Sequence, residues 1–207
     1  MKLAYRDTPA EAPGPPAVVL HREGMASTGD LATVALASGA VGRVVAPFGD
    51  YAYTANGMEV AGVCWYRILP GFAGTDPISL VKAVVQVGDL LDDLNLEHPV
   101  LIGWGQGGVV ALGAGLLAAG MVESVVCVDV PPAHVELLPA AAWATIAPPR
   151  LLLVATEVSD HPTRDEVRTS LGRRGVDATT WQWSGEGGPE DRDKALAQRI
   201  GRWLEHG

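Results

Sequence analysis

The sequence predicts an α/β fold in a single domain, residues 1–207, with a mostly parallel sheet of about seven strands, helices on both faces and no large lid. Short apolar segments rich in valine and leucine alternate along the chain with segments of helical periodicity. No repeat, linker or block of charge divides the sequence, and a chain of 207 residues is long enough for one substantial core. Together these two observations favour one doubly covered sheet.

The elements follow from apolar runs, caps and turn residues. The expected strands are residues 3–6, 17–22, 42–47, 100–104, 124–130, 150–156 and 178–184. The expected helices are residues 28–38, 76–95, 106–119, 163–174 and 190–205, and loops are expected at 7–16, 47–63, 131–149 and 184–189. Asp76 and Pro77 form an N-cap and first helical turn, and Gly175 is a stop signal for the fourth helix.

Composition limits the classes of partner. Apolar residues make up 48% of the chain, which excludes a disordered protein. The formal charge of −9 and the lack of a Lys/Arg cluster predict no nucleic-acid partner. The N-terminus has no apolar core of signal-peptide length, and the apolar stretch near 109–119 is too short to span a bilayer. We therefore expect a soluble, cytoplasmic protein with no membrane partner.

The two cysteines, Cys64 and Cys127, lie 63 positions apart and do not form a disulfide framework. Both are expected to be buried packing residues. No His or Cys pairs occur at the spacing of metal ligands, so neither a metal nor another cofactor is predicted.

The segment "VLIGWGQGGVVALGAGL", residues 100–116, carries the main functional signal. It begins as a buried strand, turns through four glycines and continues as a helix of small residues. This is the pattern of a nucleophile elbow, G-x-S-x-G, in which a strained turn exposes a serine. Here Gly105 takes the place of that serine, so the turn is expected without its nucleophile.

The chain resembles the phospholipase/carboxylesterase group of α/β-hydrolases, which includes acyl-protein thioesterases. The resemblance covers nearly the whole chain and rests on "VVLHREG", the Trp65-Tyr66 pair, "GWGQGG" and the closing "RIGRWL". It implies the α/β-hydrolase fold. Because fold and activity separate easily, it does not by itself imply esterase activity.

The resemblance also places a catalytic triad, of which two members are missing. Gly105 offers no attacking atom. The loop at 184–191, where the family carries its histidine, has Glu186 or Gly188 in that place. The family's acid corresponds to Ser159 or Asp160. A conventional serine esterase is therefore not expected, and a single engineered change of the serine would not also remove the histidine.

Other polar residues are predicted at the carboxyl ends of the strands, where ligands bind in an open α/β sheet. One oxyanion-hole donor would be the backbone of Gln106. The other would come from the loop at His21, where Arg22 replaces the family's glycine and either meets an anionic ligand or lies on the surface. The candidate catalytic residues are Asp129, His134, Asp160 and His161. The candidate ligand-binding residues are His21, Arg22, Trp65, Trp104, Gly105 and Gln106.

Two functions remain open. The first is a catalytically degenerate hydrolase that binds a small acyl or aromatic ligand, or a partner, in space left above Gly105. The second is an enzyme of non-serine mechanism that uses rim Asp and His residues. It would transfer an acyl group from a thioester, for which a carrier protein is a partner, or act as a lyase or isomerase. The segment 131–149 places Leu137, Leu138 and Trp143 in a loop, and two interpretations of these apolar residues stay open: contact with a second copy in a homodimer, or ordinary packing onto the domain.

Overall fold

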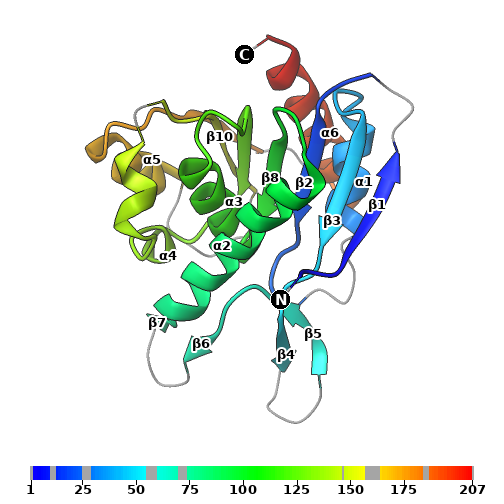
Figure 1. Ribbon diagram of the computed structural model, residues 1–207. Coiled ribbons are helices and arrows are strands. Elements are labelled where there is room, and N and C mark those ends of the chain that lie inside the picture. Colours follow the sequence, from blue (N-terminus) through cyan, green and yellow to red (C-terminus); the bar gives the residue numbers. More distant parts are fainter. Residues whose placement is uncertain are drawn as a thin grey trace.

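The computed structural model describes residues 2–9, 13–24, 29–54, 60–69, 74–145, 147–156, 164–183 and 187–206. Its main sheet has seven strands in the order β1-β3-β2-β8-β9-β10-β11 (Figure 1). The edge strand β1 pairs antiparallel with β3, and the other pairs are parallel. The strands are β1 (Tyr5–Pro9), β2 (Pro16–Leu20), β3 (Arg43–Pro47), β8 (Val100–Trp104), β9 (Ser124–Val128), β10 (Arg150–Ala155) and β11 (Thr179–Gln182). The mostly parallel seven-stranded sheet of the prediction is confirmed.

Helices cover both faces of this sheet, as predicted. They are α1 (Gly29–Ala37), α2 (Pro77–Leu94), α3 (Gln106–Leu117), α4 (Pro132–Val135), α5 (Arg164–Arg173) and α6 (Pro189–His206). In Figure 1, α2 and α3 lie in front of the sheet, and α1 and α6 lie behind it. One core cluster joins α2, α3 and α5 to strand residues such as Leu20, and the other joins α1 and α6 to residues such as Val19. Alternate residues of β2 therefore belong to opposite cores, which is why the parallel strands are apolar throughout.

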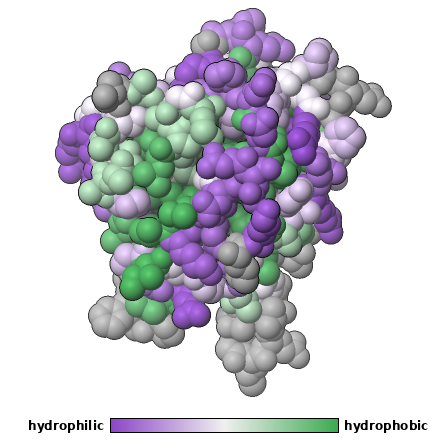
Figure 2. All heavy atoms as spheres, in the orientation of Figure 1, coloured by the Kyte–Doolittle hydropathy of each residue, from purple (hydrophilic) through white to green (hydrophobic). Residues whose placement is uncertain are grey.

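The helix α2 shows how the sequence determines an element. The Asp76 carboxylate accepts a hydrogen bond from the Ile78 backbone N–H at 3.1 Å, and Pro77 occupies the first turn. Leu80, Val84, Val87 and Leu91 are buried, whereas Asp89, Asp92 and Asp93 face solvent. Hydrophilic side chains gather across the middle of the face shown in Figure 2, on the side where α2 lies. Burial of the apolar stripe therefore fixes the orientation of α2.

Three predicted loops contain secondary structure, so those predictions were wrong in part: β1 is Tyr5–Pro9, which extends into the predicted loop 7–16, and two more loops contain elements of their own. The region 47–63 contains the antiparallel hairpin of β4 (Tyr51–Thr54) and β5 (Val60–Cys64), and a second small pair follows, β6 (Ile68–Leu69) with β7 (Gly74–Thr75). These strands are very short and pair only with each other, which leaves little periodic signal. Likewise, 131–149 contains α4 and a 3₁₀ helix, Ala140–Ala144.

The three apolar side chains of the segment 131–149 on which the homodimer prediction rests are packed against the protein itself. Leu138 is buried, and Leu137 and Trp143 pack against the core. The Arg174 guanidinium lies 4.6 Å from the centre of the Trp143 ring. The homodimer stays a prediction without this support. Within the described ranges, no helix is both long and apolar enough to cross a membrane.

Candidate functional site

The predicted elbow is present as a strand, a one-residue turn and a helix. β8 ends at Trp104 and α3 begins at Gln106. Between them Gly105 adopts φ 55° and ψ −119°, a backbone conformation that is strained for any residue with a side chain. Its N–H donates to the Val128 carbonyl at 2.9 Å. The turn that positions a nucleophile in serine hydrolases is therefore retained around a glycine.

The space above Gly105 is not empty, contrary to the prediction, because the Glu23 side chain fills it. A Cβ built on Gly105 would lie 2.6 Å from Glu23 Oε2 and 3.5 Å from Oε1. The same Oε2 accepts a hydrogen bond from the Gln106 N–H at 3.2 Å. This N–H is the predicted oxyanion-hole donor. Glu23 thus occupies the place of a residue-105 side chain and accepts the hydrogen bond of the N–H that was predicted to hold an oxyanion.

His21 and Trp65 were predicted to bind ligand, but the geometry gives both a structural role. His21 Nε2 accepts a hydrogen bond from the Gly49 N–H at 3.0 Å, so the proton is on Nδ1, which donates to the Arg22 carbonyl at 2.7 Å. Burial lowers the pKa of His21, which keeps the ring neutral. The ring stacks on Trp65 at 5.0 Å, and Trp65 Nε1 donates to the His21 carbonyl at 2.8 Å. Only 2% and 1% of their surfaces are exposed, so both side chains lie in the interior, and their ligand-binding roles stay predictions.

The side chain of Gln106 is likewise committed to the fold. Its Oε1 accepts the backbone N–H groups of Trp65 at 3.0 Å and Tyr66 at 3.4 Å, and its Nε2 donates to the Tyr66 carbonyl at 3.2 Å. These bonds attach the segment after β5 to the start of α3. Only the backbone N–H of Gln106 is directed to the site.

Asp129, a candidate catalyst, lies at the carboxyl end of β9, where its carboxylate accepts three hydrogen bonds from neighbouring residues. Its carboxylate accepts the Thr156 N–H at 2.7 Å, the Thr156 hydroxyl at 2.5 Å and Trp104 Nε1–H at 3.1 Å. Burial raises the pKa of Asp129, and these hydrogen bonds oppose that rise. The residue therefore joins β8, β9 and β10 at their ends, and Arg192 covers the outer face of the Trp104 ring at 4.8 Å.

His134 is the candidate catalyst that retains a suitable partner. Its Nδ1 lies 2.9 Å from the Tyr66 hydroxyl, and the two rings meet edge to face at 5.6 Å. His134 is half-buried, whereas Tyr66 is fully buried. Burial, followed by the negative charge of Glu23, raises the pKa of Tyr66 well above its ordinary value. The Glu23 charge therefore acts on the phenol of this pair.

Of the remaining predicted residues, some lie outside the described part of the chain. Ser159, Asp160, His161 and Glu186 lie outside the described residues. The Arg22 side chain is exposed. The described residues form no group of three or more His, Cys, Asp or Glu that could hold a metal ion.

Both cysteines are buried, as predicted. Burial raises the pKa of Cys127 to about 12. Burial and the Glu23 charge also raise the pKa of Cys64. Neither thiol is therefore available as a replacement nucleophile.

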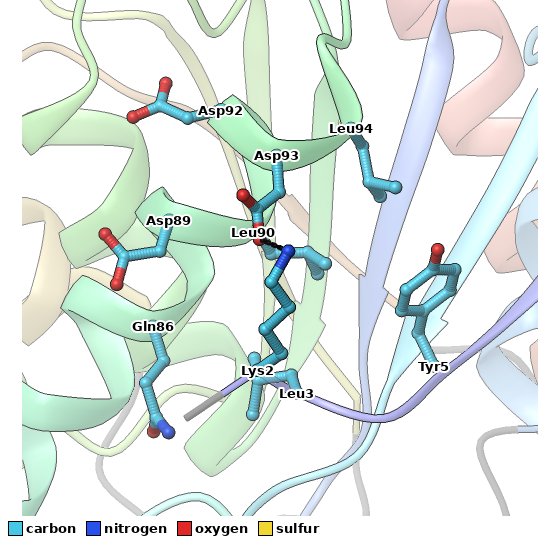
Figure 3. Close-up of a pocket in the computed structure, with 9 residues that line it drawn as sticks. All are labelled: Lys2, Leu3, Tyr5, Gln86, Asp89, Leu90, Asp92, Asp93 and Leu94. Atoms are coloured by element: carbon cyan, nitrogen blue, oxygen red, sulfur yellow. Dashed lines mark ion pairs between the residues drawn. The ribbon is translucent and has the colours of Figure 1, made fainter.

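A cavity of about 420 Å³ lies away from the elbow, between α2 and the segment that leads into β1 (Figure 3). Lys2 forms an ion pair with Asp93 across it at 3.0 Å, and Asp89 and Asp92 lie on its α2 side. No residue of the elbow lines this cavity. It is therefore separate from the candidate site.

Glu23 is a residue of the candidate site that is not among the residues predicted from the sequence. A usable signal was present: a carboxylate stands in the oxyanion-hole loop of the same chain that has a glycine at the elbow. A large residue and a small residue at facing positions suggest that one fills the space of the other.

No protein-family model and no curated protein matches this sequence. Solved structures do match its fold. The carboxylesterase from Mesorhizobium loti has 20% identity and a TM-score of 0.75, with 98% of this chain and 94% of that chain covered. Esterase PE8 has 21% identity and a TM-score of 0.69 over 99% and 100% of the two chains. Arabidopsis thaliana SOBER1 has 16% identity and a TM-score of 0.66 over 93% and 98%. The chain therefore has the α/β-hydrolase fold, in the form that esterases and carboxylesterases of similar size adopt.

Proposed function

We propose that this protein is a catalytically degenerate α/β-hydrolase that binds a small acyl or aromatic ligand, or a partner, at the elbow edge of its sheet. One observation carries the proposal: the Glu23 carboxylate occupies the place of the nucleophile side chain and accepts the Gln106 N–H. Hydrolysis through an acyl-enzyme needs an attacking atom there and a free donor for the oxyanion. Neither requirement is met, while the location remains the usual ligand site of an open α/β sheet.

The first test is hydrolysis of p-nitrophenyl acetate and butyrate. We expect no turnover above background and no labelling by a serine-directed fluorophosphonate. A turnover on the order of 10 per second, ordinary for an enzyme, would contradict the proposal. Ligand binding itself is tested by following the Gln106 backbone amide in ¹H–¹⁵N spectra during titration with small acyl and aromatic compounds. If the ligand binds at the elbow, the signal of the Gln106 amide should shift at lower ligand concentration than the signals of distant amides.

Two variants separate a missing nucleophile from a blocked site. Gly105→Ser supplies the hydroxyl, and Gly105→Ser with Glu23→Ala also removes the carboxylate that would clash with it. We expect neither protein to hydrolyse esters, because members of a triad act as a unit and the family's histidine is missing from the sequence. Robust activity in the double variant alone would show that Glu23 is the block and that another base lies within reach.

A second candidate function has one specific observation in its favour. The Tyr66 hydroxyl and His134 Nδ1, 2.9 Å apart, form a pair through which a proton can pass. Such a pair suits acyl transfer from a thioester, or lyase or isomerase chemistry, without a covalent intermediate. The test is turnover of short acyl thioesters with and without an amine acceptor. Activity that His134→Ala abolishes and Asp89→Asn leaves intact would favour this function.

A further inference from the structure

Glu23 is a half-buried carboxylate that uses only part of its capacity to accept hydrogen bonds. Oε2 accepts the Gln106 N–H, and Oε1 accepts none from the described part of the chain. Among the ion pairs of the described residues, none involves Glu23. The α3 N-terminus, whose Gln106 N–H it accepts, therefore supports the charge of Glu23, and this end of the helix dipole is worth only a fraction of an elementary charge.

The neighbouring groups respond to this charge. Besides burial, the Glu23 charge raises the pKa of both Cys64 and Tyr66, and it partly offsets the lowering of the pKa of His21 by burial. The Cys64 thiol, the Tyr66 phenol and the His21 ring are all uncharged in these pKa conditions, with the first two protonated and the ring neutral. The carboxylate therefore lies among buried neutral groups that do not balance it, where an opposite charge is stabilised more than it would be in water.

Asp129, the other described carboxylate at this edge, does not share the same property. It accepts three hydrogen bonds, from Thr156 and Trp104. Of these two carboxylates, Glu23 is thus the one with an oxygen that accepts no hydrogen bond from the described part of the chain. An incoming anion would have to displace it from Gln106 N–H, whereas an incoming cation can use Oε1 with the structure as it stands.

We propose that the elbow site binds an organic cation, a primary ammonium group on a small apolar body, through a charge-assisted hydrogen bond to Glu23 Oε1. The inference rests on the proposed function, since it takes the elbow edge as the ligand site, and it specifies the polar end of the ligand. The electrostatic preference of the site is then opposite to that of a serine hydrolase, which stabilises a negative oxygen at this position.

The experiment uses three probes of one shape: benzylamine as the ammonium, benzyl alcohol as the neutral compound and benzoate as the anion. Each is titrated into the ¹⁵N-labelled full chain at constant ionic strength, and the Gln106 amide is followed. We expect benzylammonium to bind in the millimolar range, benzyl alcohol at least about tenfold more weakly, and benzoate not at all.

Glu23→Gln keeps the shape and one acceptor but removes the charge, and it should weaken benzylammonium binding at least about tenfold. Asp89→Asn, an exposed carboxylate on the separate cavity, is the matched control for net charge and should leave binding unchanged. Glu23→Asp retains the charge and should still prefer the ammonium over benzoate. It keeps the proposal testable if the glutamine variant does not fold.

The outcomes separate the two levels of inference. Equal binding of benzyl alcohol and benzylammonium, with a shift at Gln106, would overturn the cation proposal and retain the elbow as a ligand site. Binding of benzoate in preference to benzylammonium would do the same. No shift at Gln106 with any probe would contradict both.

Discussion

Gly105→Ala tests whether Gly105 and Glu23 form one structural unit. The added Cβ would lie 2.6 Å from Glu23 Oε2, closer than real Cβ contacts, so the carboxylate must move away. It would then lose its hydrogen bond to the Gln106 N–H, and α3 would lose the group that caps it, since Gly105 supplies no side-chain cap. The variant also places a side chain at φ 55°.

These effects can be given magnitudes. Backbone strain at Gly105 should cost about 1–3 kcal/mol. Loss of a charged cap at the helix N-terminus should cost about 1–2 kcal/mol. Gly105→Ala should therefore lower the free energy of unfolding by about 2–5 kcal/mol, and Glu23→Ala by about 1–2 kcal/mol. In the double variant the cap is lost only once, so the two changes should be sub-additive by about 1–2 kcal/mol.

The assay is equilibrium urea unfolding of the four proteins, followed by tryptophan fluorescence. Gly39→Ala is the matched control, because Gly39 also has positive φ, 70°, but a Cβ there would meet nothing within 4 Å. Its cost should be strain alone and should add to that of Glu23→Ala. If Gly105→Ala and Glu23→Ala also add, within about 0.5 kcal/mol, the carboxylate does not occupy the place of a residue-105 side chain and the reasoning is refuted.

Two further variants test other contacts. Gln106→Ala leaves the buried Trp65 N–H and Tyr66 carbonyl unpaired. It should lower the free energy of unfolding by about 2–4 kcal/mol in the same urea assay. A loss below about 1 kcal/mol would show that these groups find other partners. Hydrogen bonds from Arg174 and Ser170 lower the pKa of Glu136 from its ordinary value of 4.5 to about 2. The ionised carboxylate therefore stabilises the fold at pH values above 4.5, and this contribution is lost as the pH falls from 4.5 towards 2. Because Glu136 is exposed, Glu136→Gln should cost at most about 1 kcal/mol at neutral pH. The stabilities of the variant and parent should converge in acid, and a difference that stays constant from pH 6 to pH 2 would contradict this.

The sequence predicted the sheet well because its strands are buried on both faces. Residues 100–104 are all buried, so every position in the strand is apolar or glycine and no other assignment fits. The helix that follows was equally clear, since glycines at 107 and 108 allow close approach to β2 and β8. Where strands pair outside the main sheet, as β4 and β5 do, the run of alternating residues was too short to predict a strand.

The site was less predictable because its contacts are non-local. The Glu23 to Gln106 hydrogen bond joins residues 83 positions apart, and no periodicity reports which way a loop side chain points. Residue type alone also does not show whether a side chain lies at a site or in the core: His21 and Trp65, predicted to bind ligand, are buried and joined by one hydrogen bond and a ring stack. Asp160 and His161 lie outside the described residues, so their roles stay predictions.

Glycine at 105 and glutamate at 23 are best understood as complementary. The turn and the N-terminus of α3 create one exposed backbone donor, the Gln106 N–H, which needs an acceptor. In a serine hydrolase that acceptor is the transient oxygen of a reacting substrate. In this chain it is the Glu23 carboxylate, which fits because position 105 has no side chain. A donor that is occupied in this way cannot stabilise an oxyanion selectively in a transition state, since catalysis depends on interactions that strengthen only there. In our proposal the same carboxylate, held by one oxygen, presents the other as an acceptor for the donor group of a ligand.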